Sequence, residues 1–530
     1  KNPVSISERP PYQTQLSSLF YQGSLAFRNY LTLNVYGRND WNSTLVYNDG
    51  HGKFSYFYPG VDLAWVFTDS FKSVLPTAFD YGKLRMSYVI SRNSTNAYTA
   101  NTGAYQANSP YIDADGNSVI SYQYQSNTLP NQTLEPERTN KFEAGLELKI
   151  FRNRVGADIT YYTQDTKNQI ISFGVPNSSG VDRSLVNAGV VRNRGIEVQL
   201  YTTPIKGENF SWTTFFNYTR NRNTVLSLPF GLKYTSLGGG DGFEAIAKVG
   251  GEYGTIIAPY GYAKYQATAA DGSPIESPLN GKRVLIAGSN SSTYFARAVN
   301  YAQGLDKSPV VGSILPKFMG SWRNNFRYKA FSMNVMLDSK FGGKIFSTTT
   351  DLGQWLGNTK STLFGRNTAT GGLTYTNNDG VEMTDGIIAD GVYKQGTIVI
   401  GLDKQSHDIS GMTHQEAYDQ GIVRPTRALA HYANGHSWGV GIREDAIFTS
   451  SWVSLQQVSI AYDLPKNVAN KFLLNGLTAS ITGNNLLYLY NSAKDKVNPM
   501  NLNSTGSGAM IESSGMPYIR SMGFSINGSF

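Results

Sequence analysis

Apolar and polar residues alternate with a period of two at the C-terminal end of the chain. Met522, Phe524 and Ile526 fall in one set with Phe530, whereas the residues between them are glycine, serine and asparagine. Such alternation is typical of a β-strand whose faces meet different surroundings, because successive side chains point to opposite sides. The sequence therefore predicts that the chain ends in a strand with one apolar face.

The same alternation occurs in the interior of the chain. In "NKFEAGLELKIF" (140–151) the even-numbered positions from 142 to 150 are apolar, and four of the odd-numbered positions are charged. The segment "RVGADITYY" (154–162) repeats the pattern. Only Arg152 and Asn153 separate the two segments, so the sequence predicts two antiparallel strands joined by a tight turn.

Segments with this alternation recur from one end of the chain to the other. They predict thirteen strands, at about 12–27, 30–39, 59–68, 82–91, 140–151, 154–162, 192–203, 209–219, 319–328, 331–341, 448–462, 477–488 and 518–530. In "SWVSLQQVSIAY" the phase shifts between Leu455 and Val458, which predicts a β-bulge there.

The connections between these strands alternate in length. Short ones follow residues 27, 151, 203, 328 and 462, and two of the long ones cover about 220–318 and 342–447. Short turns on one side and long loops on the other are the organisation of an outer-membrane barrel. One apolar and one polar face on each strand suits lipid outside and water inside. The predicted fold is therefore all-β, a transmembrane antiparallel up-and-down β-barrel, with a secreted all-β adhesin or propeller as the alternative.

The composition agrees with a β-rich membrane protein. The 530 residues include 34 Tyr and 54 Gly, but only 16% are charged, against roughly 25% in a typical soluble domain. The sequence contains no stretch of about 18 consecutive apolar residues, so no membrane-spanning helix is predicted. Cysteine is absent, which excludes disulfides and thiolate chemistry, and the net charge of +8 is too diffuse for a nucleic-acid site.

The last strand and the number of strands predict whether this chain contains a whole barrel. A final strand that ends in Phe530, with Ile526 and Phe524 on the same face, resembles the recognition signal of the outer-membrane assembly machinery. Single-chain bacterial barrels have an even number of strands, but thirteen are predicted here. We therefore expect residues 1–530 to be the C-terminal part of a barrel, its tenth to twenty-second strands in a plugged barrel of about 22 strands. The signal peptide, the plug domain and the TonB box are expected outside this chain.

Several stretches resemble the SusC/RagA family of TonB-dependent outer-membrane transporters of Bacteroidetes. They are "LTLNVYGRNDW" (31–41), "FSYFYPGVDLAWVF" (54–67), "LEPERTNKFEAGLEL" (134–148), "LVNAGVVRNRGIEVQL" (185–200), "LPKFMGSWRNNFRYKAFSMNV" (315–335), "WVSLQQVSIAYDLP" (452–465), "SITGNNLL" (480–487) and "GFSINGSF" (523–530). The resemblance covers essentially all the predicted strands and weakens in the two longest loops.

This resemblance implies active nutrient import across the outer membrane. In the family a plug domain fills the barrel, TonB with ExbB and ExbD supplies energy, and a SusD-like surface lipoprotein covers the barrel. Transporter–lipoprotein pairs can form dimers. The resemblance implies an oligosaccharide cargo ahead of a peptide cargo, and no enzyme activity or cofactor. A peptide importer of the RagA type and a passive porin remain as alternatives.

Motifs for catalysis or metal binding are missing. The sequence has no G-x-S-x-G, P-loop or H-E-x-x-H motif. His407, His414, His431 and His436 share the second long loop, but their spacing matches no metal-ligand pattern, so no metal site is predicted. "YIDADGNS" (111–118) lacks the later ligands of a calcium loop and is interpreted as a polar hairpin tip.

Aromatic residues of the long loops are the candidate ligand-binding residues, because rings supply apolar contact area with few rotatable bonds. The alternative is that these rings pack the loops together or against the lid partner. The six candidates are Tyr260, Tyr262 and Tyr265 in the first long loop and Trp355, Phe364 and Tyr375 in the second. The low charge of the loops and their Tyr, Trp, Asn and Gln content favour a neutral oligosaccharide.

Overall fold

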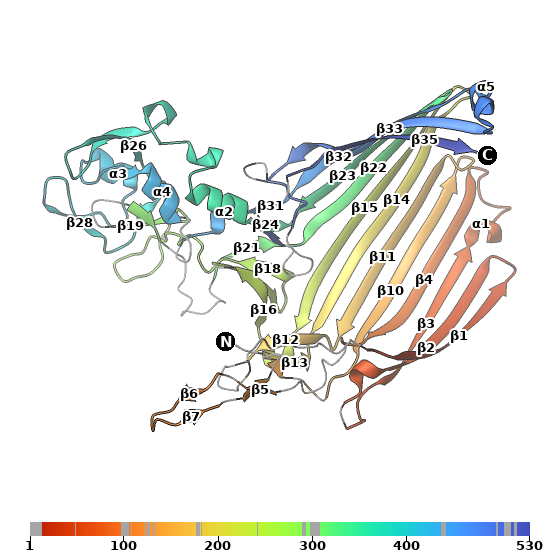
Figure 1. The fold of residues 1–530 in the computed structure, drawn as a ribbon, viewed down its shortest axis with the longest axis horizontal. Coiled ribbons are helices and arrows are strands. Elements are labelled where there is room, and N and C mark those ends of the chain that lie inside the picture. Colours follow the sequence, from red (N-terminus) through yellow and green to blue (C-terminus); the bar gives the residue numbers. More distant parts are fainter. Residues whose placement is uncertain are drawn as a thin grey trace, which may run out of the picture. The chain divides into compact units, whose positions relative to one another are not determined.

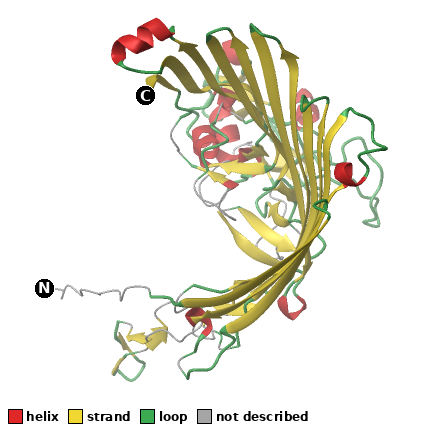
Figure 2. Cartoon of the chain, turned by 90° about the vertical axis from the view of Figure 1, so that its right-hand side faces the viewer, coloured by secondary structure: helices red, strands yellow, loops and turns green. Residues whose placement is uncertain are grey.

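The structure is a computed structural model. It describes residues 13–47, 49–96, 105–107, 109–120, 122–124, 128–129, 131, 133–175, 181, 183–240, 242–288, 293–296, 308–435, 441–493, 495, 497–502, 510–513 and 517–530. Strands make up most of its regular structure, and its helices are short (Figure 2). Among the described residues, no helix is both long and apolar enough to cross a bilayer.

Thirteen strands form the largest sheet within the described part of the chain (Figure 1). In sheet order they are β1 (Leu16–Phe27), β2 (Leu31–Asn42), β3 (Ser55–Val66), β4 (Phe79–Asn93), β10 (Glu137–Ile150), β11 (Val155–Lys167), β14 (Val190–Lys206), β15 (Phe210–Ser227), β22 (Pro316–Tyr328), β23 (Phe331–Gly342), β32 (Trp452–Asp463), β33 (Gly476–Asn491) and β35 (Ser521–Ser529). Their order in the sheet is their order in the chain, which is an up-and-down arrangement.

Each predicted strand overlaps one strand of this sheet, so the all-β, up-and-down prediction is confirmed. The predicted bulge is also present, because the register between β32 and β33 shifts between Leu455 and Gln457. The main differences are at strand ends. For example, β15 continues to Ser227, eight residues beyond the predicted end at 219. Its last residues, "RNRNTVLS", lack the clear alternation that marked the earlier part.

The two faces of the sheet differ as the alternation predicts. Leu146 on β10 lies opposite Leu84 on β4 and Ile159 on β11, so one face carries a row of apolar side chains. The next position, Glu147, lies opposite Lys83 and Asp158, and the Lys83 ammonium is 3.4 Å from the Glu147 carboxylate. We call the face of Leu146 the outward face and the face of Glu147 the inward face.

Tight turns join the strands at one end. Residues 28–30 join β1 to β2, with Arg28 and Asn29 at positive φ, and Phe151, Arg152 and Asn153 follow β10, also with positive φ. The connections at the opposite end are long: residues 228–315 separate β15 from β22, and residues 343–451 separate β23 from β32. The first begins eight residues later and ends three residues earlier than the predicted 220–318, and the second begins one residue later and ends four residues later than the predicted 342–447.

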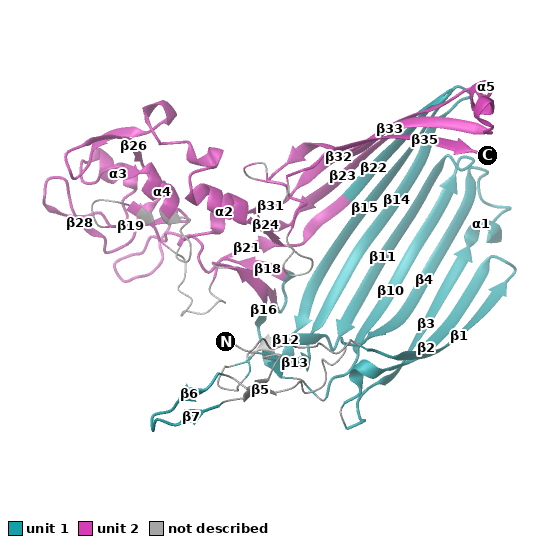
Figure 3. Cartoon of the chain, viewed as in Figure 1, with its two compact units in different colours: residues 1–235, 248–253, 320–332 teal, residues 236–247, 254–319, 333–530 magenta. Residues whose placement is uncertain are grey.

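The chain divides into two compact units (Figure 3). Unit 1 contains residues 1–235, 248–253 and 320–332, and unit 2 contains residues 236–247, 254–319 and 333–530. Besides its long strands, unit 1 has α1 (Phe67–Ser70), β5 (Tyr105–Ala107), β6 (Tyr111–Ile112), β7 (Ser118–Val119), β8 (Tyr122–Tyr124), β9 (Thr128–Leu129), β12 (Ile170–Gly174) and β13 (Arg183–Asn187).

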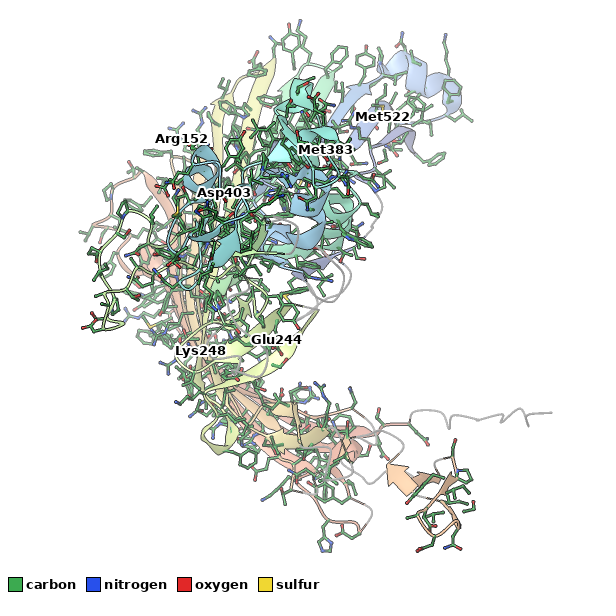
Figure 4. All side chains as sticks on the ribbon, turned by 90° about the vertical axis from the view of Figure 1, so that its left-hand side faces the viewer. Arg152, Glu244, Lys248, Met383, Asp403 and Met522 are labelled. Carbon is green, nitrogen blue, oxygen red and sulfur yellow. The ribbon has the colours of Figure 1, made fainter. Side chains whose placement is uncertain are left out.

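Unit 2 folds its long connections into small sheets and helices. These are β19 (Val284–Ala287), β20 (Thr293–Phe295), β21 (Val310–Ser313), β24 (Lys344–Ser347), α2 (Thr348–Trp355), β25 (Leu373–Thr376), β26 (Glu382–Ile387), β27 (Val392–Tyr393), β28 (Ile398–Ile400), β29 (Ser406–Asp408), α3 (His414–Asp419), β30 (Thr426–Arg427), α4 (Ala428–Gly435), β31 (Ile447–Thr449), α5 (Lys466–Ala469) and β34 (Ile511–Glu512). Three more strands, β16 (Tyr234–Gly240), β17 (Phe243–Lys248) and β18 (Tyr253–Ile257), form a sheet with β21. Figure 4 labels Glu244 and Lys248 on β17 and Met383 on β26.

The largest buried clusters lie in these connections rather than on the long strands. One contains Leu285, Ala389, Tyr393, Ile409, Ala417, Ile422 and Val423. Another contains Phe243, Ala245, Ile256, Ala258, Phe346, Ala446, Ile447 and Met510. A connection that packs around its own apolar core keeps its surface side chains in fixed positions, whereas a loop without such a core does not.

The outward face provides a first prediction. Replacing Leu146 by Arg should reduce the yield of folded protein, since an arginine at mid-bilayer on the lipid side costs about 2–4 kcal/mol. Glu147→Arg, one position along on the inward face, should be tolerated. Heat-modifiability of the full-length protein on gels measures the folded yield. Equal yields of the two variants would show that the assignment of faces is wrong.

Candidate functional site

The candidate site lies in the long connections of unit 2, in the described residues of 254–315 and 343–451, which we call the loop platform. Its two segments are joined by polar contacts between residues far apart in sequence. The Tyr262 hydroxyl donates to Asp445 Oδ2 at 2.5 Å, and the Arg283 guanidinium reaches Asp445 Oδ1 at 3.0 Å. One carboxylate therefore connects the first segment to the second through both of its oxygens.

The Tyr262 ring strengthens this connection. The Arg283 guanidinium carbon is 3.7 Å from the centre of the ring, a cation–π geometry. Phe295 packs edge-on against the Tyr262 ring, and the centres of the two rings are 5.1 Å apart. Burial of the hydroxyl, together with the nearby Asp445 carboxylate, raises the pKa of Tyr262 well above its usual value. Tyr262 is therefore neutral at physiological pH and serves as a hydrogen-bond donor.

A second polar cluster surrounds the start of α2. Ser347 caps the helix by accepting from the Thr350 backbone N–H at 3.0 Å, and its hydroxyl donates to Glu512 Oε2 at 2.5 Å. Asp351, in the first turn, lies 3.4 Å from the Arg443 guanidinium, and both side chains are buried. This pair joins the two ends of the second segment, next to the paired strands β24 and β31.

The second segment also exposes aromatic side chains outside the polar cluster at the start of α2, which we call the base of the platform. Trp355, the last residue of α2, is 38% exposed, and Phe364 is 59% exposed. Arg366 fixes the backbone between them by donating to the carbonyl oxygens of Gly357 and Thr362. The Tyr432 hydroxyl donates to the Phe364 carbonyl oxygen at 3.0 Å. The backbone that carries these two exposed rings is therefore held by hydrogen bonds.

The other aromatic candidates occupy more enclosed positions. Tyr262 and Tyr265 are 3% and 7% exposed, and the Tyr265 hydroxyl accepts from the Gln395 side-chain amide at 3.1 Å. Tyr260 is half-buried, and its carbonyl oxygen accepts from the Arg443 backbone N–H. Tyr375 on β25 is also half-buried, and its hydroxyl donates to Asp385 at 3.4 Å. Burial first, and then Asp385, raises the pKa of Tyr375.

The six predicted residues are thus not brought together as one surface. The buried rings of Tyr262 and Tyr265 match the alternative role of packing the loops. Trp355 and Phe364 have the most ring surface available to a ligand. Ligand contact by any of the six stays a prediction.

The described histidines of the second segment lie in different surroundings. His414 is buried: its Nδ1 accepts from the Ala389 backbone N–H at 3.0 Å, and its Nε2 donates to the Arg424 carbonyl oxygen at 3.1 Å. Burial lowers the pKa of His414, which agrees with this neutral arrangement. His407 lies 2.9 Å from Asp403, which Figure 4 labels. His436 lies outside the described residues.

No cluster of three or more potential metal-ligating side chains occurs where the structure describes the chain. The hairpin tip predicted at 111–118 is present between β6 and β7, where Asp113 accepts from the backbone N–H groups of Asp115 and Asn117. At the C-terminal end, Phe524, Ile526 and Phe530 are exposed, and the first two lie on β35. Their role as an assembly signal stays a prediction.

Sequence reasoning missed the charged residues that hold the platform together. Arg283, Asp351, Arg443 and Asp445 form two ion pairs, and Arg283 and Asp445 are 162 positions apart. No motif or periodicity links residues at such separations, so only the fold reveals the pairs. The one available signal was that charged residues flank the ends of the second long loop.

The sequence and the fold can be compared with known proteins. Residues 2–281 match the family model described as "TonB dependent receptor-like, beta-barrel". TonB-dependent receptor P3 of Formosa agariphila is 23% identical over 528 residues, which cover 98% of this chain and 46% of that receptor. TonB-dependent receptor SusC of Bacteroides thetaiotaomicron is 25% identical over 239 residues, which cover 43% of this chain and 23% of SusC. The chain therefore spans less than half the length of these relatives.

A similar fold occurs among solved structures. The RagAB peptide transporter matches with a TM-score of 0.64 and 17% identity, over 98% of this chain and 47% of that one. Its closed-closed state matches with a TM-score of 0.62. At this identity the likeness establishes the fold of the chain alone.

Proposed function

Because the chain belongs to the TonB-dependent receptor-like β-barrel family, we propose that the whole protein imports a neutral oligosaccharide actively across the outer membrane. The chain itself is an outer-membrane β-barrel segment of a transporter family, not of an enzyme family. What we propose beyond the family membership is the identity of the cargo, of the partner proteins and of the energy source. The observation that carries it is the loop platform, a folded surface with exposed aromatic rings.

The charges of the platform support a neutral cargo. Arg427 is 3.1 Å from Asp385, Arg283 is 3.0 Å from Asp445, and Asp351 pairs with Arg443. Because these charges are matched within the platform, they offer little net attraction to a charged ligand. Exposed rings such as Trp355 and Phe364 suit stacking against the C–H faces of sugars.

We propose that a SusD-like surface lipoprotein docks on the platform, and that the docked pairs can form dimers. The β28–β29 hairpin supports this partner, because Ile398 and Ile400 are 66% and 67% exposed, whereas Val399 between them packs against the buried cluster. Exposed aliphatic residues on a fixed element are typical of a protein interface. The RagAB peptide transporter has a similar fold.

We also propose that these thirteen strands are the last of about 22, around a plug that couples to TonB, ExbB and ExbD. The order of the sheet supports this, since β1 stands at one edge and β35 at the other. In lipid, an edge strand must pair with another strand, because unpaired backbone groups cost several kcal/mol each. Upstream strands would supply those pairs.

The cargo can be tested with ring substitutions in the full-length receptor bound to its lipoprotein. Trp355→Ala and Phe364→Ala should each weaken oligosaccharide binding about 10-fold, equal to about 1.4 kcal/mol, measured by calorimetry. Phe472→Ala is the matched control, because Phe472 is 64% exposed but lies in the short connection between β32 and β33. The ligands should include neutral oligosaccharides and peptides of similar length.

Three outcomes would change the proposal. Binding of peptides but not of oligosaccharides would replace the cargo by a peptide. Unchanged affinity in both ring variants would remove these residues from the binding surface. Uptake that persists after the proton gradient is collapsed would identify a passive porin.

A further inference from the structure

An arginine cluster lies on the outward face of unit 1, where a barrel meets lipid. In β11, β14 and β15 the outward row contains Ile159, Val198 and Tyr218, which lie opposite one another in register. On the same face of β14, Arg194 lies four positions before Val198, and Arg192 lies two positions before Arg194. Arg220 and Arg222 are the matching outward residues of β15.

These residues lie at the loop end of the strands. Arg192 is two residues after the start of β14, which follows the connection 168–189, and Arg222 precedes the connection 228–315. Long connections of an outer-membrane barrel are extracellular. The cluster therefore lies at the outer-leaflet rim, above an apolar band that includes Val198, Leu200 and Phe216.

The positive charge of the cluster is only partly matched. Arg192 forms a bidentate pair with Asp165, with both N–O distances at 2.6 Å. Arg194, Arg220 and Arg222 are exposed and have no ion pair with any described residue. Asp165 is the one acid on the outward face of these three strands in the described structure. On this face of the three described strands, four guanidinium groups therefore share a single carboxylate, and only Arg192 forms a direct ion pair with it.

The register makes this arrangement unfavourable by itself. Arg194 and Arg222 lie directly opposite each other on antiparallel strands. Like charges at such positions destabilise a sheet. An anion between the two strands would offset this repulsion.

The cluster also surrounds a groove. The groove has a volume of about 500 Å³ and is lined by the four arginines together with Tyr161, Ile196 and Leu226. Guanidinium groups match phosphate oxygens in a bidentate geometry. The apolar members of the lining suit the hydrocarbon next to a headgroup. Arg138 and Lys167, opposite each other in register, extend the positive rim along the neighbouring strands.

We propose that this groove binds the phosphate headgroup of an outer-leaflet lipid. The lipid headgroup bridges Arg194 and Arg222 across β14 and β15, and its acyl chains lie along the apolar band beneath. Bound in this way, the lipid neutralises the cluster and fixes the barrel in the outer leaflet. The Arg192–Asp165 pair holds the upper wall of the groove in place.

The test measures lipid retention by the full-length receptor in native mass spectrometry. The probes are phosphorylated lipid A and the same lipid A with its phosphates removed. Wild-type protein should retain the phosphorylated form at least about 10-fold better, since about 1.4 kcal/mol of phosphate contact gives that ratio. The variant Arg194→Gln/Arg220→Gln/Arg222→Gln should lose most of this preference.

A matched variant controls for the loss of three positive charges. Arg28→Gln/Arg152→Gln/Arg154→Gln removes three arginines from turns at the opposite end of the strands, and Figure 4 labels one of them, Arg152. It should retain phosphorylated lipid A like the wild type. A heat-modifiability gel shows whether each variant is folded, and the wild-type comparison of the two lipids holds even if a variant is not.

Three results would overturn the proposal. They are equal retention of the two lipids by the wild type, unchanged retention by the cluster variant, and an equal loss in the control variant. Inorganic phosphate in excess separates a headgroup site from a free-phosphate site. Equal affinities for inorganic phosphate and phosphorylated lipid A would also overturn the proposal, because the apolar band would then contribute nothing.

Discussion

Removing the second segment of the loop platform should abolish nutrient uptake while the barrel still folds. The register shows where to cut: Phe346 on β24 lies directly opposite Ile447 on β31. Replacing residues 347–446 by Asn-Gly would join Phe346 to Ile447 through a two-residue turn. Asn-Gly is the preferred sequence for such a turn between two antiparallel strands. The deletion removes α2, the exposed rings and the β28–β29 hairpin, but no residue of the thirteen-stranded sheet.

Three measurements check this expectation. Growth on the cognate nutrient should be lost, the lipoprotein should no longer co-purify in detergent, and heat-modifiability should be retained. Deletion of the β6–β7 hairpin tip, residues 113–117, is the control, because it shortens a different long connection. If the lipoprotein still co-purified and uptake persisted, the platform would be neither docking surface nor cavity wall.

The long strands could be predicted from sequence because a membrane barrel imposes one rule on every strand. Leu146 and Glu147 are neighbours in sequence but lie on opposite faces of the sheet, and a barrel wall requires apolar residues outside and polar residues inside. Even the bulge near Leu455 is visible, since an extra residue must shift the phase. Strand ends were less exact, because polar residues near the rim suit both faces.

The loop platform could not be predicted in the same way. Tyr262 and Phe364 are both aromatic residues in polar loops, but the first is buried against Arg283 and the second is exposed. What separates them is a partner 183 positions away, Asp445, which accepts from the Tyr262 hydroxyl. Composition predicts that the loops contain the ligand site, but only the contacts separate the buried rings that pack the loops from the exposed rings.

The outward arginines show a further limit of the alternation rule. "VVRNRGIEVQL" still alternates, but Arg192 and Arg194 occupy the positions that further along the strand hold Ile196 and Val198. The strand predicted at about 192–203 already includes both arginines. The structure continues the strand to Val190, and the exception then becomes informative, because it places charge at the edge of the lipid face.

Arg443→Ala should unfold the base of the platform, the largest effect we expect from a single substitution outside the barrel wall. The side chains of Arg443 and Asp351 are 7% and 2% exposed, so removing the arginine leaves a carboxylate buried without its cation. Breaking a buried pair in this way costs about 3–5 kcal/mol. Hydrogen exchange in α2 and in residues 441–449 should rise strongly, whereas the long strands should stay protected.

Two further variants separate charge from packing. Arg443→Met/Asp351→Leu removes both charges, and should recover most of the protection, because apolar side chains of similar size can replace a buried pair. Lys282→Ala breaks an exposed pair with Asp390, also at 3.4 Å, and should cost no more than about 1 kcal/mol. If Arg443→Ala were as mild as Lys282→Ala, the buried pair would not hold the platform, and the hydrogen bonds of Ser347 and Tyr262 would have to do so.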